Sequence, residues 1–357
     1  MSQSNGLSLR HESQNTAKTV ALVLIFVLIA AAGLMYVKWW PYYHKALTSA
    51  TSHSIGSSIL GDPAGQADSP TWNGAWEYAR KYFKSVWKAA VLGILLGSLV
   101  QVLIPVRWLQ RVLGGSRFKS AFYGGIVALP GMMCTCCAAP IAAGLRRKNV
   151  SAGAAISFWL GNPLLNPATL IFMTFVLSWK FTVLRIVFGA LLTFGTGYIA
   201  NRMMKGKEVE APAEMQVQES AETEESRPFW LRWAKSLGSM LVQVVPSYLA
   251  AVLVMGALKV WLFPVTEGSG FLILLLFAVA GALFVIPTAA EIPIVQSFLA
   301  AGVSTAPAAA LLLTLPAISL PSLLMVFKSF PRKIIAFVLG SVIIVGLLSG
   351  FVGAIAL

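Results

Sequence analysis

Long apolar segments alternate with short polar segments along this 357-residue chain. Several apolar windows approach about 20 residues without a charge, the length an α-helix needs to cross about 30 Å of hydrocarbon. The pattern predicts an all-α polytopic membrane protein. The predicted segments are a polar tail at 1–19, an extra N-terminal transmembrane helix at 20–40, an external loop at 41–71, a first transmembrane block at 72–200, a charged cytoplasmic linker at 201–227 and a second transmembrane block at 228–357.

The two transmembrane blocks repeat each other at an offset of 153 residues. Pro140 then aligns with Pro293, and Pro163 aligns with Pro316. Paired, interrupted hydrophobic segments at corresponding positions indicate the binding site of a secondary transporter. The prolines expected to break or kink these segments are Pro130, Pro140, Pro163, Pro167, Pro287, Pro293 and Pro316.

The low charge content supports a membrane protein. Only 11% of the residues are charged, whereas an ordinary soluble domain has about 25%. The net charge is +14, from 27 basic and 13 acidic residues. Because the basic residues cluster in short loops, as in membrane proteins generally, the charge indicates membrane topology, and no nucleic-acid partner is expected.

The basic clusters also predict an orientation. The positive-inside rule places residues 146–148 and 328–333 in the cytoplasm. This requires Ala121–Leu145 to enter and leave from the cytoplasm as a re-entrant or broken hairpin, and its counterpart Phe271–Val303 to do so from outside. The blocks would then be inverted repeats, each with three spans and one hairpin. A full crossing by Ala121–Leu145 is the alternative.

The N-terminal helix is expected to be retained. Its apolar part, Val20–Val37, is long for a secretory signal peptide, which is the alternative. The following Lys38, Trp39 and Trp40 are typical of an anchor at the membrane interface.

All three cysteines of the chain, Cys134, Cys136 and Cys137, lie within four residues of each other, around Thr135. Thiolates are soft ligands that favour thiophilic centres such as Cu(I) and zinc, and trivalent arsenicals share that affinity. A closed structural zinc site needs four ligands, and no fourth cysteine or histidine is near in the sequence. The cluster therefore predicts transient binding of a thiophilic substrate or ion, without a resident cofactor. Inert packing of the thiols is the alternative.

Polar residues inside apolar segments are the next candidates. Asn162 and Asn166, each followed by proline, are expected either to line the substrate path or to satisfy backbone groups freed by the kinks. Glu291 lies in an apolar segment, where a carboxylate is by default a functional hypothesis. We expect Glu291 to carry a coupling proton, and a water-facing position at a hairpin tip is the alternative. Arg185 is expected to extend to the membrane interface from a span end.

Two motifs resemble a known family. The stretches Cys134–Pro140 and Asn162–Pro167 resemble the Cys-Ser-Cys-Gly-x-x-Pro and Pro-x-x-Asn-Pro segments of the predicted permease family of the ArsP and YraQ type. Thr135 replaces the serine, and Cys137 replaces the glycine. The resemblance implies a permease of the bacterial inner membrane. Some members of the family export trivalent organoarsenicals, with a membrane cysteine pair implicated. The positions that match are Cys134, Cys136, Pro140, Pro163, Asn166 and Pro167.

The leading hypothesis is a secondary efflux permease, not an enzyme, for a small thiophilic or soft-metalloid substrate. Cys134, Cys136 and Cys137 would bind the substrate, with Thr135, Asn162 and Asn166 also contributing, and Glu291 would couple proton entry. An intramembrane thiol–disulfide relay and a passive structural subunit are the alternatives. The expected partners are the substrate and membrane lipid, and self-association into a homo-oligomer is left open.

Overall fold

The computed structural model describes residues 20–61, 72–104, 106–115, 118–204, 228–263 and 270–357. The predicted tail at 1–19, most of the linker at 201–227 and part of the loop at 41–71 lie outside these ranges. Within them, every regular element is a helix, and six helices are long and apolar enough to cross a membrane. The prediction of an all-α polytopic membrane protein is confirmed. The six are Val20–Ser52, Trp72–Leu103, Trp179–Met204, Phe229–Leu262, Thr305–Val326 and Arg332–Ala356.

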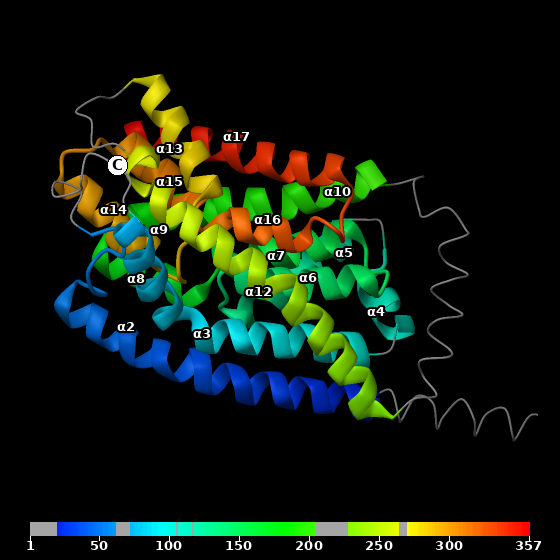
Figure 1. The fold of residues 1–357 in the computed structure, drawn as a ribbon. Helices are drawn as coiled ribbons and strands as arrows, with labels where there is room; N and C mark the ends of the chain where they lie inside the picture. The colour runs from blue at the N-terminus through cyan, green and yellow to red at the C-terminus, as the bar shows by residue number, and fades with distance from the viewer. Residues whose placement is uncertain (1–19, 62–71, 105, 116–117, 205–227, 264–269) are drawn as a thin grey trace, which may run out of the picture.

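The helices fall into two series along the chain (Figure 1). The first comprises η1 (Met35–Trp39), α2 (Trp40–Ser52), α3 (Trp72–Leu103), α4 (Val106–Leu113), α5 (Phe118–Ala128), η3 (Leu129–Gly131), α6 (Thr135–Arg147), α7 (Ala152–Leu164), α8 (Pro167–Val176), α9 (Trp179–Ala190), η4 (Leu191–Gly195) and α10 (Thr196–Met204). The second comprises α12 (Phe229–Leu262), α13 (Phe271–Leu283), α14 (Glu291–Ala300), α15 (Thr305–Ala317), α16 (Leu320–Val326) and α17 (Arg332–Ala356).

The N-terminal helix is longer than predicted. It continues to Ser52, so residues 41–52, predicted as loop, are helical. A proline ring inside a helix clashes with the carbonyl four residues earlier. Here the π-helical turn η1 precedes Pro41, and the Trp40 amide bonds to the Met35 carbonyl, five residues back. The widened turn lets the helix continue through Pro41.

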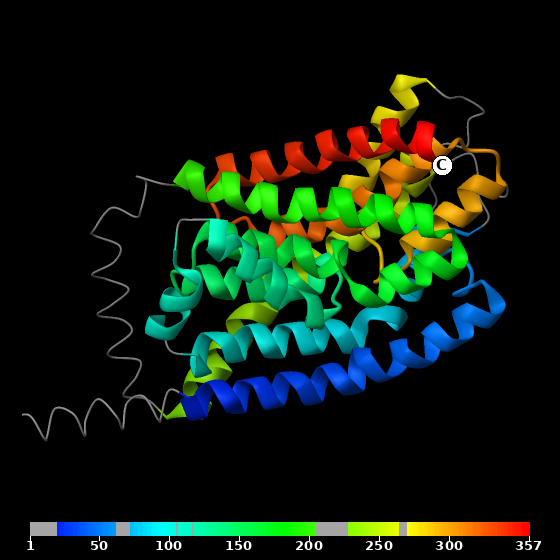
Figure 2. The same ribbon diagram turned by 180° about the vertical axis from the view of Figure 1, so that it is seen from behind.

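Two broken hairpins lie at opposite ends of the molecule: α5 with α6, and α13 with α14 (Figure 1 and, from behind, Figure 2). Helices α5 and α6 have 11 and 13 residues, or about 17 and 20 Å at 1.5 Å per residue. Neither reaches the roughly 30 Å of a hydrocarbon core. The interruption predicted at Pro130 is present, since α5 ends at Ala128 and α6 begins at Thr135.

Helix boundaries recur at the predicted offset of 153 residues. Helices α7 and α15 begin at Ala152 and Thr305 and end at Leu164 and Ala317. Helices α8 and α16 begin at positions 167 and 320, and α9 and α17 begin at 179 and 332. The coincidence supports an internal repeat, while the inverted relation between the blocks stays a prediction.

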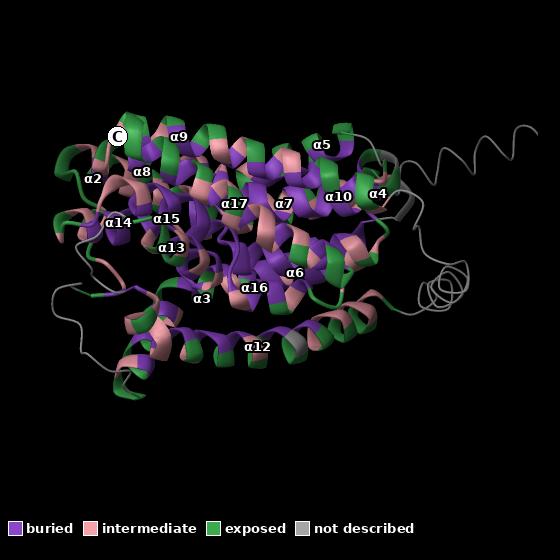
Figure 3. Ribbon diagram, turned by 90° about the horizontal axis from the view of Figure 1, so that it is seen from above, coloured by how far each residue is buried: buried purple, intermediate pink, exposed green. Residues whose placement is uncertain are grey.

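The broken segments occupy the centre of the bundle. Buried residues dominate α6, α7, α15 and α16 (Figure 3). In the span Thr305–Val326, 83% of the most apolar stretch is buried, against 6% for Val20–Ser52 on the outside. Small residues allow close packing, as where Gly124 of α5 faces the backbone of Ala154 of α7. The breaks are therefore surrounded by protein, where irregular backbone is tolerated in a membrane.

Candidate functional site

The three thiols lie at the start of α6 and form a pair and a single residue. All three are free and buried. The sulfurs of Cys134 and Cys137 are 2.8 Å apart, because residues three apart lie on one face of a helix. The Cys136 sulfur instead lies 3.1 Å from Ser319 Oγ. A site in which all three thiols hold one centre is therefore not formed in this structure, whereas a two-thiol site is.

Thr135 and Cys136 connect the first hairpin to the break in the second block. Thr135 Oγ1 donates to Ser322 Oγ at 3.2 Å, and Ser322 Oγ also accepts from the Ser319 amide at 3.0 Å. Ser319 and Ser322 begin the short helix α16. The predicted substrate residue Thr135 thus contacts the other block directly.

Lys38, which was predicted to anchor the N-terminal helix at the membrane interface, belongs to this site. Lys38 is 5% exposed, and its ammonium donates to Tyr42 Oη at 3.0 Å and Thr288 Oγ1 at 3.1 Å. It lies close enough to Cys134 and Cys137 to interact electrostatically with both. The interface-anchor prediction is therefore wrong for Lys38, because the helix continues past it and η1 directs it inward. The sequence contained one sign of this position: residues that can form a helix continue beyond Lys38, so the lysine does not mark the end of the helix.

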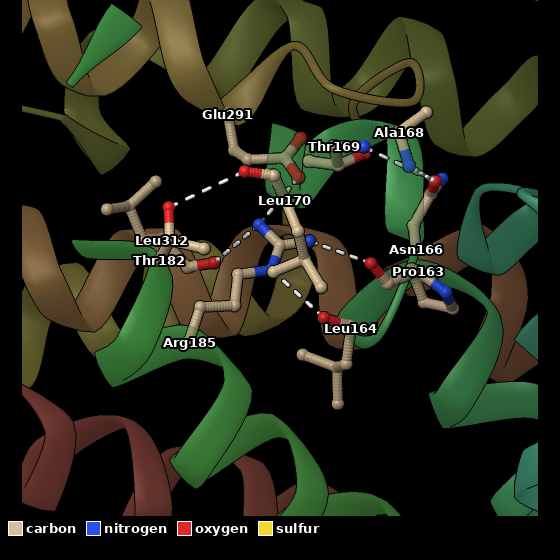
Figure 4. Close-up of polar contacts among 10 residues, drawn as sticks. All are labelled: Pro163, Leu164, Asn166, Ala168, Thr169, Leu170, Thr182, Arg185, Glu291 and Leu312. Atoms are coloured by element: carbon tan, nitrogen blue, oxygen red, sulfur yellow. Dashed lines mark hydrogen bonds and ion pairs between the residues drawn. The ribbon is translucent and has the colours of Figure 1, made fainter. Parts of the chain in front are cut away.

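Glu291 of α14 and Arg185 of α9 form a buried ion pair (Figure 4). The Arg185 Nη1–Glu291 Oε1 distance is 2.7 Å, and both side chains are almost fully buried. The predicted interfacial position of Arg185 is wrong, and so is the alternative of a water-facing Glu291. Arg185 lies in the second turn of the long crossing formed by α9, η4 and α10, and the sequence contains no local sign of its partner 106 residues away.

Arg185 also holds three backbone carbonyls. It donates to Pro163 O at 2.7 Å, Leu164 O at 3.1 Å and Leu312 O at 3.2 Å. Two of these acceptors lie at the end of α7, where the chain breaks before α8, and the third lies in α15. One guanidinium thus connects both broken spans to α14.

Asn162 and Asn166 each have one polar atom bonded and one free. Asn162 Nδ2 donates to Phe158 O at 2.9 Å. Asn166 Oδ1 caps α8, accepting from the amides of Ala168 at 3.1 Å and Thr169 at 3.3 Å (Figure 4). Asn162 Oδ1 and Asn166 Nδ2 are buried and have no hydrogen-bond partner among the described residues. The kink-stabilising role is thus present, and one polar atom of each residue remains available.

The breaks of both blocks meet at one pocket. Cys134 and Thr135 contribute from the first hairpin, and Glu291 contributes from the second. The thiols and the carboxylate lie on two separate hairpins, as predicted, and Cys134 and Glu291 nevertheless line the same pocket. The complete lining is Cys134, Thr135, Pro163, Ile286, Pro287, Thr288, Ala289, Glu291, Leu315 and Pro316.

The predicted prolines lie at or beside these breaks. Pro130 is in η3 and Pro167 starts α8, while Pro287 lies in the non-helical turn before α14. Pro293 is in the first turn of α14. The others lie inside helices that the chain continues through: Pro140 in α6, Pro163 in α7 and Pro316 in α15.

The thiol pair is the part of this site suited to a thiophilic centre, and it can supply two bonds to one. Within the described ranges, no group of three or more histidine, cysteine, aspartate or glutamate side chains is placed to hold an ion.

Comparison with known proteins identifies the family. The model of a family described as a predicted permease matches residues 71–355. The chain belongs to this family. Among relatives of this permease, UPF0718 protein YraQ of Escherichia coli (strain K12) is 50% identical over 313 residues, covering 87% of this chain and 88% of the relative. UPF0718 protein MJ0584 of Methanocaldococcus jannaschii is 28% identical over 130 residues, covering 35% of this chain and 36% of the relative.

No solved structure matches the permease. The resemblance inferred from the cysteine and Asn-Pro motifs is confirmed by the family match and by the relative from Escherichia coli. Together with six apolar helices of spanning length, family membership makes the chain an integral membrane protein of the transport class and favours a transporter over an enzyme.

Proposed function

We propose that this permease is a secondary exporter of a small thiophilic substrate resembling a trivalent organoarsenical, in the inner membrane of a bacterium. The observation that carries the proposal is the free pair of Cys134 and Cys137, whose sulfurs are 2.8 Å apart. Cys134 lines a pocket between the two transmembrane blocks. Substrate and coupling sites of secondary transporters lie at such an interface between repeats, beside discontinuous helices.

Binding to two thiols needs no oxidant. A trivalent arsenical with two hydroxyl groups forms two As–S bonds and loses two As–O bonds. The two thiol protons leave with the hydroxyls as two molecules of water, and arsenic and sulfur keep their oxidation states. Water reverses the reaction, so the same pair can release the substrate on the other side of the membrane.

We assign Cys136 and Thr135 a role that differs from that of the Cys134–Cys137 pair. Their contacts with Ser319 and Ser322 couple the first hairpin to the break in the second block. Occupation of the thiol pair shifts the start of α6, and these contacts transmit the shift. The free atoms Asn162 Oδ1 and Asn166 Nδ2 provide polar contacts along the substrate path.

Proton coupling is assigned to the Arg185–Glu291 pair. Glu291 Oε2 is buried without a hydrogen-bond partner, so a proton can bind there. The proton neutralises the carboxylate and weakens its attraction for Arg185, which also holds carbonyls of α7 and α15. Proton binding and release therefore alter the geometry of both broken spans, as alternating access between inverted repeats requires.

Single serine substitutions test the function. In cells lacking other arsenical efflux, Cys134→Ser and Cys137→Ser should each lose methylarsenite resistance at unchanged protein level. Cys136→Ser, in the same helix turn, is the matched control: its hydroxyl can keep the contact with Ser319, so it should retain most resistance. Export of methylarsenite from everted vesicles measures the same effect without growth. Resistance that survives both Cys134→Ser and Cys137→Ser rules the proposal out.

The thiol–disulfide relay stays as a second candidate because the close pair has Cys-x-x-Cys spacing. A relay must cycle between dithiol and disulfide. Thiol trapping in growing cells separates the two functions, since a pair that remains reduced under all conditions excludes the relay. Inert thiols, as in a passive structural subunit, would make all three serine variants indistinguishable from the parent.

A further inference from the structure

Lys38 is a buried cation, and no carboxylate in the described part of the chain forms a salt bridge with it. It is 5% exposed, and the two salt bridges found among the described residues involve Lys81 with Glu77 and Arg185 with Glu291. Burying an isolated ammonium is costly unless a partner compensates it. A charged residue inside a membrane segment is by default a functional candidate. Lys38 is therefore a candidate for binding an anionic ligand.

One hydrogen of the Lys38 ammonium has no acceptor among the described residues. An ammonium has three donors, and two are taken by Tyr42 Oη at 3.0 Å and Thr288 Oγ1 at 3.1 Å. These acceptors belong to α2 and to the break before α14. The two bonds fix the ammonium beside that break, and the third donor is free to bind a ligand.

The ammonium lies beside the pocket that Cys134 lines. It donates to Thr288, and Thr288 and Cys134 both line that pocket. The ammonium is also near enough to Cys134 and Cys137 for an electrostatic interaction. Lys38 occupies the π-helical turn η1 (Met35–Trp39), and such single turns occur frequently at functional sites. It lies outside the residues matched by the family model, 71–355. The N-terminal helix thus adds a positive charge to a site otherwise built from the two blocks.

We propose that Lys38 is a substrate-binding residue that selects ligands with a negative charge beside their thiol-reactive atom. The inference rests on the proposed function and narrows its substrate class. A small soft anion fits this description, and so does a trivalent arsenical with a carboxylate close to arsenic. In either case Cys134 holds the thiol-reactive atom, and the free ammonium donor of Lys38 binds the negative group.

Matched alkylating reagents test the charge preference without transport. Iodoacetate and iodoacetamide react with thiols by the same displacement, in which an S–C bond forms, iodide leaves and the thiol proton is released. The first reagent is anionic and the second is neutral. Their rates are measured at Cys134 by mass spectrometry on the purified full chain in detergent. Lys38→Met removes the charge at similar length, and Lys38→Arg retains it.

The expected result is a change in the ratio of the two rates. Lys38→Met should lower the iodoacetate-to-iodoacetamide ratio about fivefold or more, since a unit charge pair in a partly buried site interacts strongly. Lys38→Arg should preserve most of the ratio. Lys84→Met, at an exposed position of α3, is the control for the loss of a positive charge, and it should leave the ratio unchanged.

Two outcomes overturn the proposal. An unchanged ratio in Lys38→Met removes the anion-binding role. Equal slowing of both reagents means that Lys38 acts only on the thiol. If Lys38→Met does not fold, the parent still provides a test, since its ratio at Cys134 must exceed that of glutathione at the same pH. The ratio does not depend on transport, so the proposed function fails separately, through Cys134→Ser cells that keep methylarsenite resistance.

Discussion

At the scale of single residues, the Arg185–Glu291 pair gives a sharp prediction. Both side chains are buried, with 2.7 Å between the charged atoms. Removing one partner of a buried pair leaves a charge without compensation and costs about 3–5 kcal/mol. Arg185→Met should therefore lower the unfolding temperature strongly in detergent. The double variant Arg185→Met, Glu291→Met should recover part of the loss, because no charge remains.

Recovery in the double variant is expected to be incomplete. Pro163, Leu164 and Leu312 lose the donor that their carbonyls share, and a buried acceptor left without a donor is itself unfavourable. Lys328→Met, an exposed position at the end of α16, controls for the loss of any positive charge. A double variant as unstable as Arg185→Met alone would show that the carbonyl contacts, and not the charge pair, stabilise the site.

The surroundings of single residues are also the feature that the sequence predicts least well. Cys134, Glu291 and the Asn-Pro residues could be singled out because their chemistry is unusual in an apolar segment. Lys38 and Arg185 were assigned to the interface from their position near the ends of apolar runs. Their burial depends on a π-helical turn and on contacts with segments more than 100 residues away. No local pattern contains that information.

At the scale of elements, Asn166 lies at the break between α7 and α8, and its two polar atoms have different proposed roles. One caps α8, and the other binds the substrate. Asn166 Oδ1 accepts two amide hydrogens at the start of α8, while Nδ2 has no partner. Asn166→Ala should cost about 0.5–2 kcal/mol of stability through loss of the cap. Asn166→Ser keeps a capping oxygen without adding a charge and loses the Nδ2 donor. It should keep the unfolding temperature near that of the parent and reduce methylarsenite export several-fold.

The unfolding temperature and the export of methylarsenite together distinguish the capping role of Asn166 from its substrate-binding role. Parental export by a stable Asn166→Ser would reduce the residue to a helix cap.

Breaks in elements could be predicted well, and helix lengths less well. A proline lacks the amide hydrogen and blocks helical geometry in the preceding residue, so Pro130, Pro167 and Pro287 correctly located interruptions. Pro140 and Pro316 lie within helices, because packed neighbours can compensate a lost backbone bond in a membrane protein. At Pro41 the π-helical turn has the same effect, and the helix continued through a segment predicted as loop.

At the scale of the whole molecule, the inverted-repeat prediction concerns which side of the membrane each hairpin faces. Arg147 and Ala300 end the two hairpins at α6 and α14, correspond at the offset of 153 and are both exposed. The hairpins lie at opposite ends of the bundle (Figure 1), and the basic residues following α6 favour the cytoplasm. In a background with serine at Cys134, Cys136 and Cys137, Ala300→Cys should react with a membrane-impermeant maleimide in intact cells. Arg147→Cys should react only after permeabilisation.

The cysteine-free parent gives the background signal. Trp261→Cys, at an exposed position near the end of α12 beside the second hairpin, should behave like Ala300→Cys. Labelling of positions 147 and 300 from the same side would contradict inverted repeats and leave two parallel blocks, since the offset in sequence carries no information about direction across the membrane.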